Sequence, residues 1–290
     1  ASVSGRVDGV AGEVASVSGR VDGVAGEVAS VSGRVDGLAS GVESVSGRDS
    51  WKAHSRQIPD HEARLLAQTF KHTLGVSVEW KEIKYWSSKI TTIEEVLSGR
   101  LAASTSTVAL RIACCLATGT ANPRILEVGT LFGIGVYAMN EILEGYGVEA
   151  EFTLLDRFDG YYATRDRDLI TGVRIDRAVV EANLARSRGW TRGAFQLETG
   201  DSTNPTSFDL PSSHDYDVVI LDGDHSSSGV ASDLITFGAR VRQGGFLVVD
   251  DYGNPQWPGV KAGTDSVLTD DSALRRVWEG ANSLVSRNLA

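Results

Sequence analysis

Carboxylates stand at the ends of two short apolar runs, in a pattern that is typical of a site for chemistry. Residues 218–221 and 246–249 are rich in β-branched side chains and are bounded by turn signals, as strands buried on both faces are. Polar residues follow at once: Asp222, Asp224 and His225 after the first run, and Asp250 and Asp251 after the second.

The segment between these runs predicts that the two strands are neighbours. Residues 230–241 have the spacing of an amphipathic helix, so the unit is a strand–helix–strand crossover with parallel strands. Neighbouring strands lie about 4.8 Å apart, and ligands of open α/β sheets bind at the carboxyl ends of strands. The carboxylates therefore converge, and their repulsion predicts a cation between them. We expect a divalent metal ion; the alternative is that the acids only form turns or cap helices.

A glycine-rich turn precedes this pair of strands. Residues 124–128 have the pattern of a strand, and Gly129, Gly133 and Gly135 follow it. Such glycines let the backbone approach a ligand at a helix N-terminus. The spacing is not the Gly-x-Gly-x-x-Gly that an NAD(P)-dependent oxidoreductase would show, and Glu127 would repel a pyrophosphate. The turn therefore favours a cationic cofactor.

Two further strand ends complete the predicted cofactor site. A strand over residues 152–155 leads to Asp156, which is placed to bind ribose hydroxyls. A strand around residues 195–197 is followed by Asp201 and Ser202, where the amino group of an adenine would be recognised.

Taken in order, these pieces resemble the class I S-adenosylmethionine-dependent methyltransferases. Within that superfamily they resemble the metal-dependent macrocin O-methyltransferase group, which acts on sugar hydroxyls. The resemblance covers roughly residues 100–285 and rests on an ordered series: Glu127-Val-Gly129, Asp156-Arg-Phe158-Asp-Gly160, Gly200-Asp201, Asp222-Gly-Asp224-His225, Gly244-Gly245, Asp250-Asp251-Tyr252 and Pro258-Gly-Val-Lys261. It implies an α/β fold, a Rossmann-like sheet with helices on both faces.

The resemblance also implies S-adenosylmethionine and Mg²⁺ as cofactors and a role for each matching residue. The cofactor contacts would come from Glu127, Gly129, Thr130, Gly133, Asp156, Asp201, Ser202 and Asp222. The Mg²⁺ ligands would be Asp222, Asp250 and Asp251. The general base would be His225 or Asp224, and we favour His225 because a cation lowers the pKa of a neighbouring carboxylate. The turn at residues 130–133 is longer and less polar than in that group.

The first 48 residues form a repeat. A fourteen-residue unit starts at Ser2 and Ser16, with a degenerate copy at Ser30 and a fragment at Ser44. Apolar residues recur at alternating spacings of four and three, the seam of a coiled coil. Each glycine costs about 1 kcal/mol of helix stability, so only self-association would hold such a helix. We expect a parallel coiled coil, with a homotrimer favoured; the alternative is a flexible linker.

The rest of the chain divides into a small cap and a larger domain. Residues 49–100 predict a linker and a helical cap, with helices over residues 61–74 and 91–97. The methyltransferase domain would span residues 101–290 and include an apolar helix over residues 104–117.

The composition of the 290 residues limits the class of protein. The net charge of −10 and a pI near 5.0 argue against a nucleic-acid-binding protein. Cys114 and Cys115 are adjacent in an apolar segment, which predicts reduced core residues and a cytoplasmic location. Apolar runs stay below the ~20 residues that span a bilayer, because Arg111 interrupts the best candidate. No signal peptide is evident.

These observations predict an S-adenosylmethionine-dependent, Mg²⁺-dependent O-methyltransferase. The expected acceptor is a sugar hydroxyl of a glycosylated natural product or surface glycan. One alternative keeps the fold and the metal but methylates a catechol or another phenol. The other is a non-catalytic coiled-coil scaffold with a degenerate methyltransferase domain, and the intact set of acids argues against it.

Overall fold

The computed structural model describes residues 57–160, 166–210, 215–270, 272–280 and 282–289. The repeat of residues 1–48, with the coiled coil and the trimer predicted from it, lies outside the described residues. None of the helices in the described part of the chain is long and apolar enough to cross a membrane.

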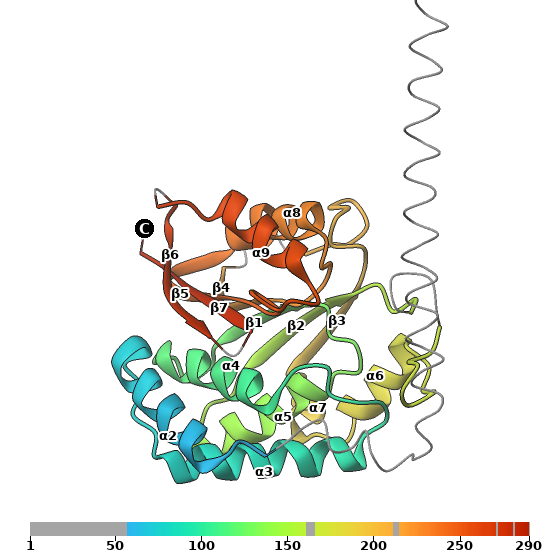
Figure 1. The fold of residues 1–290 in the computed structure, drawn as a ribbon. Coiled ribbons are helices and arrows are strands. Elements are labelled where there is room, and N and C mark those ends of the chain that lie inside the picture. The colour runs from blue at the N-terminus through green and yellow to red at the C-terminus, as the bar shows by residue number, and fades with distance from the viewer. Residues whose placement is uncertain (1–56, 161–165, 211–214, 271, 281, 290) are drawn as a thin grey trace, which may run out of the picture. The chain divides into compact units, whose positions relative to one another are not determined.

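Seven strands form one sheet in the order β3-β2-β1-β4-β5-β7-β6 (Figure 1). The first five strands of the chain run parallel, whereas β7 pairs antiparallel with both β5 and β6. The strands are β1 Arg124–Val128, β2 Glu151–Asp156, β3 Phe195–Thr199, β4 Tyr216–Leu221, β5 Val241–Val249, β6 Leu274–Gly280 and β7 Ser283–Asn288. The predicted parallel pairing of the two acid-ended strands is confirmed, with Val218 opposite Phe246.

Helices cover both faces of the sheet (Figure 1). One face carries α8 Ser227–Gly238 and α9 Pro258–Val267, and the other carries the remaining helices. These are α2 Asp60–Thr69, the π-helical turn Phe70–Leu74, α3 Trp80–Val96, α4 Thr105–Ala117, α5 Ile134–Leu143, the 3₁₀ turn Glu144–Tyr146, α6 Arg177–Leu184 and α7 Arg188–Thr191. The expected Rossmann-like sheet with helices on both faces is thereby confirmed.

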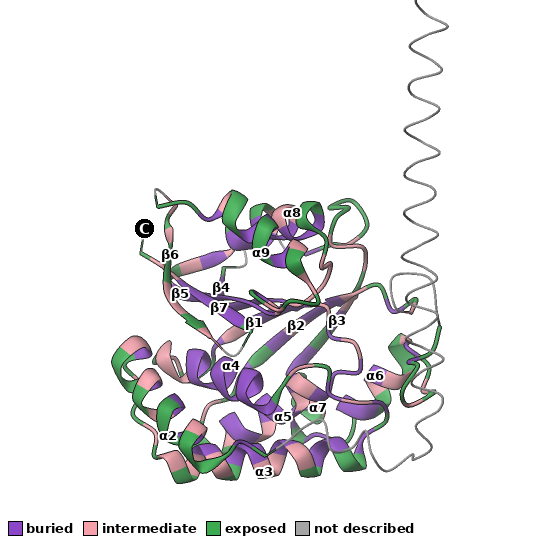
Figure 2. Ribbon diagram, in the orientation of Figure 1, coloured by how far each residue is buried: buried purple, intermediate pink, exposed green. Residues whose placement is uncertain are grey.

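Alternating strand residues supply a separate hydrophobic core on each face. Val218 and Ile220 of β4 belong to the core under α4 and α5, whereas Val219 and Leu221 belong to the core under α8 and α9. This is the two-residue period of a strand. All of β4 is buried, as Figure 2 shows for the centre of the sheet. The site at its carboxyl end therefore rests on a rigid element.

The cap differs from the prediction in one respect. The short helix expected over residues 91–97 is the end of α3, which runs for 17 residues. A capping box between Glu79 and Glu82 starts this helix, and a buried stripe that includes Ile83 and Ile90 continues along it. The helix expected over residues 61–74 is present as α2 and the π-helical turn.

The apolar helix expected over residues 104–117 is α4, which begins after its N-cap Ser104. The Ser104 hydroxyl accepts a hydrogen bond from the Thr107 amide at 3.0 Å. Cys114 and Cys115 are fully buried in α4 as free thiols, as expected of core residues. Arg111 is buried in the same helix, and a charge there requires partners.

Candidate active site

A cavity of about 530 Å³ lies at the carboxyl ends of the parallel strands. The ends of β1 and β2 and the loops after β3, β4 and β5 form its floor. Its other walls include residues 100–104, which lead into α4, and polar residues of the loop between β5 and α9. A cavity of this size accommodates a cofactor or a drug-sized ligand.

Most of the predicted site residues line this cavity: Gly129, Asp156, Asp201, Ser202, Asp222, Asp224, His225, Asp250 and Asp251. The structure places three others outside its lining. Thr130 is buried, and its amide donates to Asp156. Gly133 is the left-handed N-cap of α5, where a Cβ would lie 3.1 Å from Val180 of α6. Glu127 points toward α4 instead.

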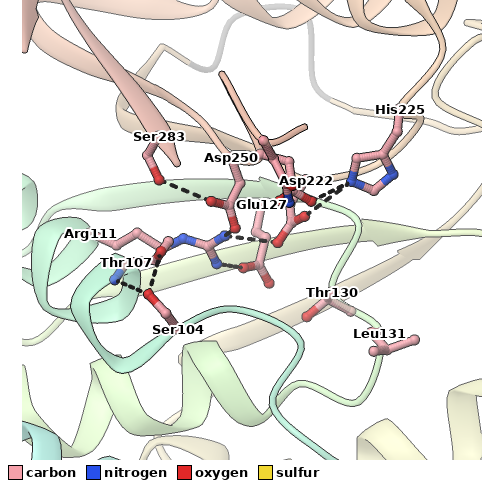
Figure 3. A network of polar contacts seen from close by, with 12 residues as sticks. Ser104, Thr107, Arg111, Glu127, Thr130, Leu131, Asp222, His225, Asp250 and Ser283 are labelled. Carbon is pink, nitrogen blue, oxygen red and sulfur yellow. Dashed lines mark hydrogen bonds and ion pairs between the residues drawn. The ribbon is translucent and has the colours of Figure 1, made fainter. Parts of the chain in front are cut away.

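Arg111 of α4 is the partner of Glu127 and of two further carboxylates (Figure 3). Its Nη1 donates to Glu127 Oε1 at 2.9 Å. Its Nη2 donates to Asp222 Oδ2 and to Asp250 Oδ2, each at 2.8 Å. The side chain of Arg111 is 2% exposed. One buried guanidinium thus joins the carboxyl ends of β1, β4 and β5.

The charge states of this cluster follow from burial and mutual contact. Burial would lower the pKa of Arg111, but the neighbouring carboxylates outweigh this effect and the pKa is raised, so the guanidinium stays charged. Burial raises the pKa of Glu127 against the opposing effect of Arg111. Burial and the nearby Asp250 raise the pKa of Asp222 well above its usual range. The cluster holds more acidic groups than one cation can balance.

Arg111 revises one inference made from the sequence. The convergence of the carboxylates is as expected, but a cation of the chain itself lies between Asp222 and Asp250. Sequence reasoning missed this role and treated Arg111 only as an interruption of an apolar run. A single charge inside a helix that is otherwise buried was the available signal.

The predicted metal ligands divide into two groups in the structure. Both carboxylate oxygens of Asp250 are engaged, because Oδ2 accepts from Arg111 and Oδ1 accepts from Ser283 at 2.9 Å. Among the described residues, the group with the geometry for a metal ion is Asp222, His225 and Asp251, whose ligand atoms lie within 4.8 Å of one another.

His225 is held between an aromatic ring and a carboxylate. Its ring stacks on Trp257, with centroids 4.5 Å apart and planes 24° apart. Its Nε2 lies 3.0 Å from Asp251 Oδ2 and 3.9 Å from Asp222 Oδ1. Burial would raise the pKa of Asp251, but hydrogen bonds from His225 and Asn254 outweigh it and the pKa is lowered. The Asp251 carboxylate therefore stays ionised beside the imidazole.

Asp224, the other candidate base, has a structural task. Its Oδ1 accepts from the Ser226 amide at 2.6 Å, directly before α8 begins. A Cβ on Gly229 would lie 2.3 Å from Asp224 Cγ, so the carboxylate packs against the first turn of that helix. Asp224 lines the cavity, but the start of the helix fixes its orientation.

The glycine-rich turn is organised by the end of β2. The Oδ2 of Asp156 accepts from the amides of Thr130 and Leu131 at 2.9 and 3.0 Å, and Oδ1 accepts from Phe158 at 3.0 Å. Burial raises the pKa of Asp156, although these backbone donors oppose it. Gly129 has a φ of +85°, and a Cβ there would lie 2.1 Å from the Asp222 carbonyl oxygen. The turn therefore needs glycine because two strand-end loops touch.

The loop after β3 forms the far side of the cavity. A hydrogen bond from the Thr203 hydroxyl lowers the pKa of Asp201, which also pairs with Arg157 at 3.3 Å. Beneath this loop, Asp233 of α8 is 1% exposed, and burial raises its pKa to about 7 against a hydrogen bond from Ser202. This side of the cavity thus also carries an excess of carboxyl groups.

Strained backbone is concentrated around the cavity. In the part of the chain that the structure describes, the residues other than glycine with positive φ are Leu131, Phe158, Asp251 and Asn282. Three of them line the cavity, and Phe158 directly follows Arg157, which also lines it. Backbone strain of this kind costs of order 1–3 kcal/mol per residue and clusters at functional sites.

The chain is similar to one protein-family model and to several solved structures. A family model described as a methyltransferase domain matches residues 126–252. No curated protein matches the chain significantly. Solved structures that resemble it include the O-methyltransferase NovP, with 16% identity, 79% of this chain and 100% of that chain covered, and a TM-score of 0.48. CalS11, a TDP-rhamnose 3′-O-methyltransferase of calicheamicin biosynthesis, has 17% identity over 78% and 94%, with a TM-score of 0.45.

A third similar structure is the O-methyltransferase TomG from Streptomyces achromogenes in complex with S-adenosylmethionine, with 16% identity over 72% of this chain and 96% of that chain and a TM-score of 0.45.

The segment that matches the family model runs from β1 to Tyr252. It therefore contains every strand end that faces the cavity. The part of the chain that carries these strand ends is thus similar to a methyltransferase domain.

Proposed function

We propose that this methyltransferase transfers a methyl group to a hydroxyl oxygen of a sugar, on a glycosylated natural product or a surface glycan. The observation that carries the proposal is the placement of His225. Its imidazole borders the cavity at the carboxyl ends of the strands, with its ring stacked on Trp257 and its Nε2 3.0 Å from Asp251 Oδ2. A hydroxyl acceptor needs such a group to take its proton.

The lining of the cavity suits S-adenosylmethionine. Seven carboxylates face the cavity, namely Glu94, Asp156, Asp201, Asp222, Asp224, Asp250 and Asp251. Against them stand Arg100, which pairs with Asp168, Arg157, which pairs with Asp159 and Asp201, and the buried Arg111, which pairs with Asp222 and Asp250. This charge excess favours a cofactor with a positive centre. When bound, S-adenosylmethionine supplies a methyl group that its sulfonium already activates.

We assign the cofactor contacts to those predicted residues that line the cavity, and we give Asp156 and Glu127 other roles. Asp156 holds the turn at Gly129 in shape and has limited capacity left for a ribose hydroxyl, since three backbone amides donate to it. Glu127 acts through Arg111 rather than on the cofactor. Asp201 and Ser202 remain the proposed contacts on the adenine side.

Two of the three expected Mg²⁺ ligands are close enough together to bind the ion. Asp222 and Asp251 would hold it beside His225, and Asp250 would join them only by giving up its contact with Arg111. When bound, the ion would polarise an acceptor oxygen. Because Asp224 is tied to the start of α8, His225 is the group that we assign to accept the hydroxyl proton, and Asp251 stabilises the imidazolium that results.

The wall beside His225 supports a polar acceptor. Asn254, Gln256, Trp257 and Asn282 line the cavity there. Side-chain amides both donate to and accept from hydroxyls, and an indole offers a flat apolar surface with one donor. A sugar presents several hydroxyls together with apolar C–H groups, so it matches this wall better than a catechol does.

The test is methyl transfer from radiolabelled S-adenosylmethionine to a panel of glycosides and catechols. The proposal predicts labelled glycoside, and a His225→Gln variant should lose about 10²–10⁴-fold in kcat because general-base catalysis contributes that much. His72→Gln is the matched control, since His72 is exposed on the cap. Labelling of catechols alone would refute the sugar acceptor, and full activity of His225→Gln would refute the assigned base.

A further inference from the structure

The contact between Arg111 and two aspartates has the form of a bridging cation. The same nitrogen, Nη2, lies 2.8 Å from Asp222 Oδ2 and 2.8 Å from Asp250 Oδ2. These oxygens come from the ends of neighbouring parallel strands, β4 and β5. A hard divalent cation would bind the same pair of carboxylates from the same side. Two cations cannot share that position.

The second oxygen of Asp250 offers no alternative. Ser283 Oγ, at the start of β7, donates to Oδ1 at 2.9 Å, and the side chain of Asp250 is 7% exposed. Asp222, by contrast, keeps Oδ1 toward His225 Nε2, at 3.9 Å. The two aspartates therefore differ: both oxygens of Asp250 accept from protein donors, whereas Asp222 directs one oxygen toward His225 (Figure 3).

We propose that Arg111 is a positioning residue that takes the place of a divalent cation between Asp222 and Asp250. It holds the ends of β4 and β5 together without metal and excludes Asp250 from the ligands of any ion bound at Asp222 and Asp251. This inference concerns the acidic cluster alone and stands or falls independently of methyl transfer.

The experiment measures whether the effect of Mg²⁺ on stability requires Asp250. Melting temperatures of the full chain are recorded in EDTA and in millimolar MgCl₂ for the wild type, Asp250→Asn, Arg111→Gln and the double variant. For the wild type and Asp250→Asn, which both retain Arg111, we expect Mg²⁺ to shift the melting temperature by the same amount or not at all. Arg111→Gln should lower Tm by about 10 °C in EDTA. Mg²⁺ should restore about 5 °C or more, and the double variant should lose that gain.

Arg242→Gln is the matched control. Arg242 pairs with Asp217 near the amino ends of the same two strands, where no cluster of acids is present among the described residues. Its loss should lower Tm without any rescue by Mg²⁺. Rescue of both arginine variants, or a folded Arg111→Gln without Asp250-dependent rescue, would overturn the proposal.

A second measurement decides the matter if Arg111→Gln does not fold. Calorimetric titration of MgCl₂ into the wild type and into Asp250→Asn compares two proteins that both retain Arg111. The proposal requires affinities within about threefold, or no binding in either. A loss of tenfold or more in Asp250→Asn, which is about 1.4 kcal/mol, would show that Asp250 is a metal ligand and would overturn it.

Discussion

The two ends of the β4–β5 pair carry arginine–aspartate contacts of different character. Near the amino end, Arg242 pairs with Asp217, whose other oxygen accepts from the Arg124 amide at 2.7 Å. Near the carboxyl end, Arg111 faces three carboxylates. The amino end is balanced in charge and serves stability. The carboxyl end has more acidic groups than cations, and it is the end at which the cavity lies.

Backbone geometry separates the same two ends. The residues with strained backbone, such as Leu131 and Asp251, gather at the carboxyl end, beside the cavity. Turns elsewhere, such as the one at Gly147, have open space around them. Strain persists only where the surrounding structure fixes it. Both comparisons indicate that the carboxyl end gives up stability for a defined arrangement of polar groups.

The largest expected difference between the two ends concerns their arginines. Arg111→Gln leaves the buried Glu127 and Asp250 and the half-buried Asp222 without a cation, and should cost about 3–5 kcal/mol of unfolding free energy. Arg242→Gln should cost about 1–2 kcal/mol, because its side chain is 36% exposed and Asp217 keeps its amide donor. Urea unfolding of the metal-free proteins at pH 7 measures both values. Equal losses would remove the distinction between the ends.

A second comparison substitutes one glycine at each end. Gly129→Ala should destabilise by about 3 kcal/mol, since the new Cβ meets the Asp222 carbonyl and φ is positive. Gly147→Ala should cost only about 1 kcal/mol, because its φ of +71° is strained for alanine but nothing lies within 4 Å. Thermal unfolding of the two variants provides the measurement. If Gly129→Ala lost no more unfolding free energy than Gly147→Ala, the two strand-end loops would be able to move apart with little strain.

The smallest of these effects is a pH dependence at the carboxyl end. Burial raises the pKa of Asp233 to about 7, so the folded state retains a proton that the unfolded chain releases near pH 4. Stability then falls as the pH rises toward 7, and Asp233→Asn removes this loss. The stability advantage of Asp233→Asn over the wild type should grow by about 2–3 kcal/mol between pH 5 and pH 8. Denaturant unfolding at both pH values tests it, and a constant difference would contradict the assigned pKa.

The sequence predicted the elements whose signal is local. The strand over residues 124–128 matches β1, and the acid-ended strands are parallel neighbours as their crossover helix required. The hairpin of β6 and β7 escaped prediction because residues such as Arg275 and Arg276 interrupt any apolar alternation in β6. Its pairing with β5 depends on the sheet edge rather than on local pattern.

The candidate site was predictable as a convergence of acids but not as a balance of charges. Repulsion between Asp222 and Asp250 showed that a cation was needed, and a metal and an arginine satisfy that need equally well. Arg111 lies 111 residues before Asp222 and 139 before Asp250. Nothing in the spacing within α4 reveals that its guanidinium reaches the strand ends. Trp257 was missed for the same reason, since it lies in the β5–α9 loop and contacts His225 of the β4–α8 loop.

Calorimetric titration of S-adenosylmethionine and S-adenosylhomocysteine into the full chain, with Mg²⁺ and with EDTA, tests whether the cofactor site forms without a metal ion. We expect both ligands to bind in both conditions, because Arg111 rather than a metal holds the acidic strand ends together. Binding that vanishes in EDTA would contradict that role of Arg111. No binding of either ligand in either condition would contradict the assignment of this cavity to S-adenosylmethionine.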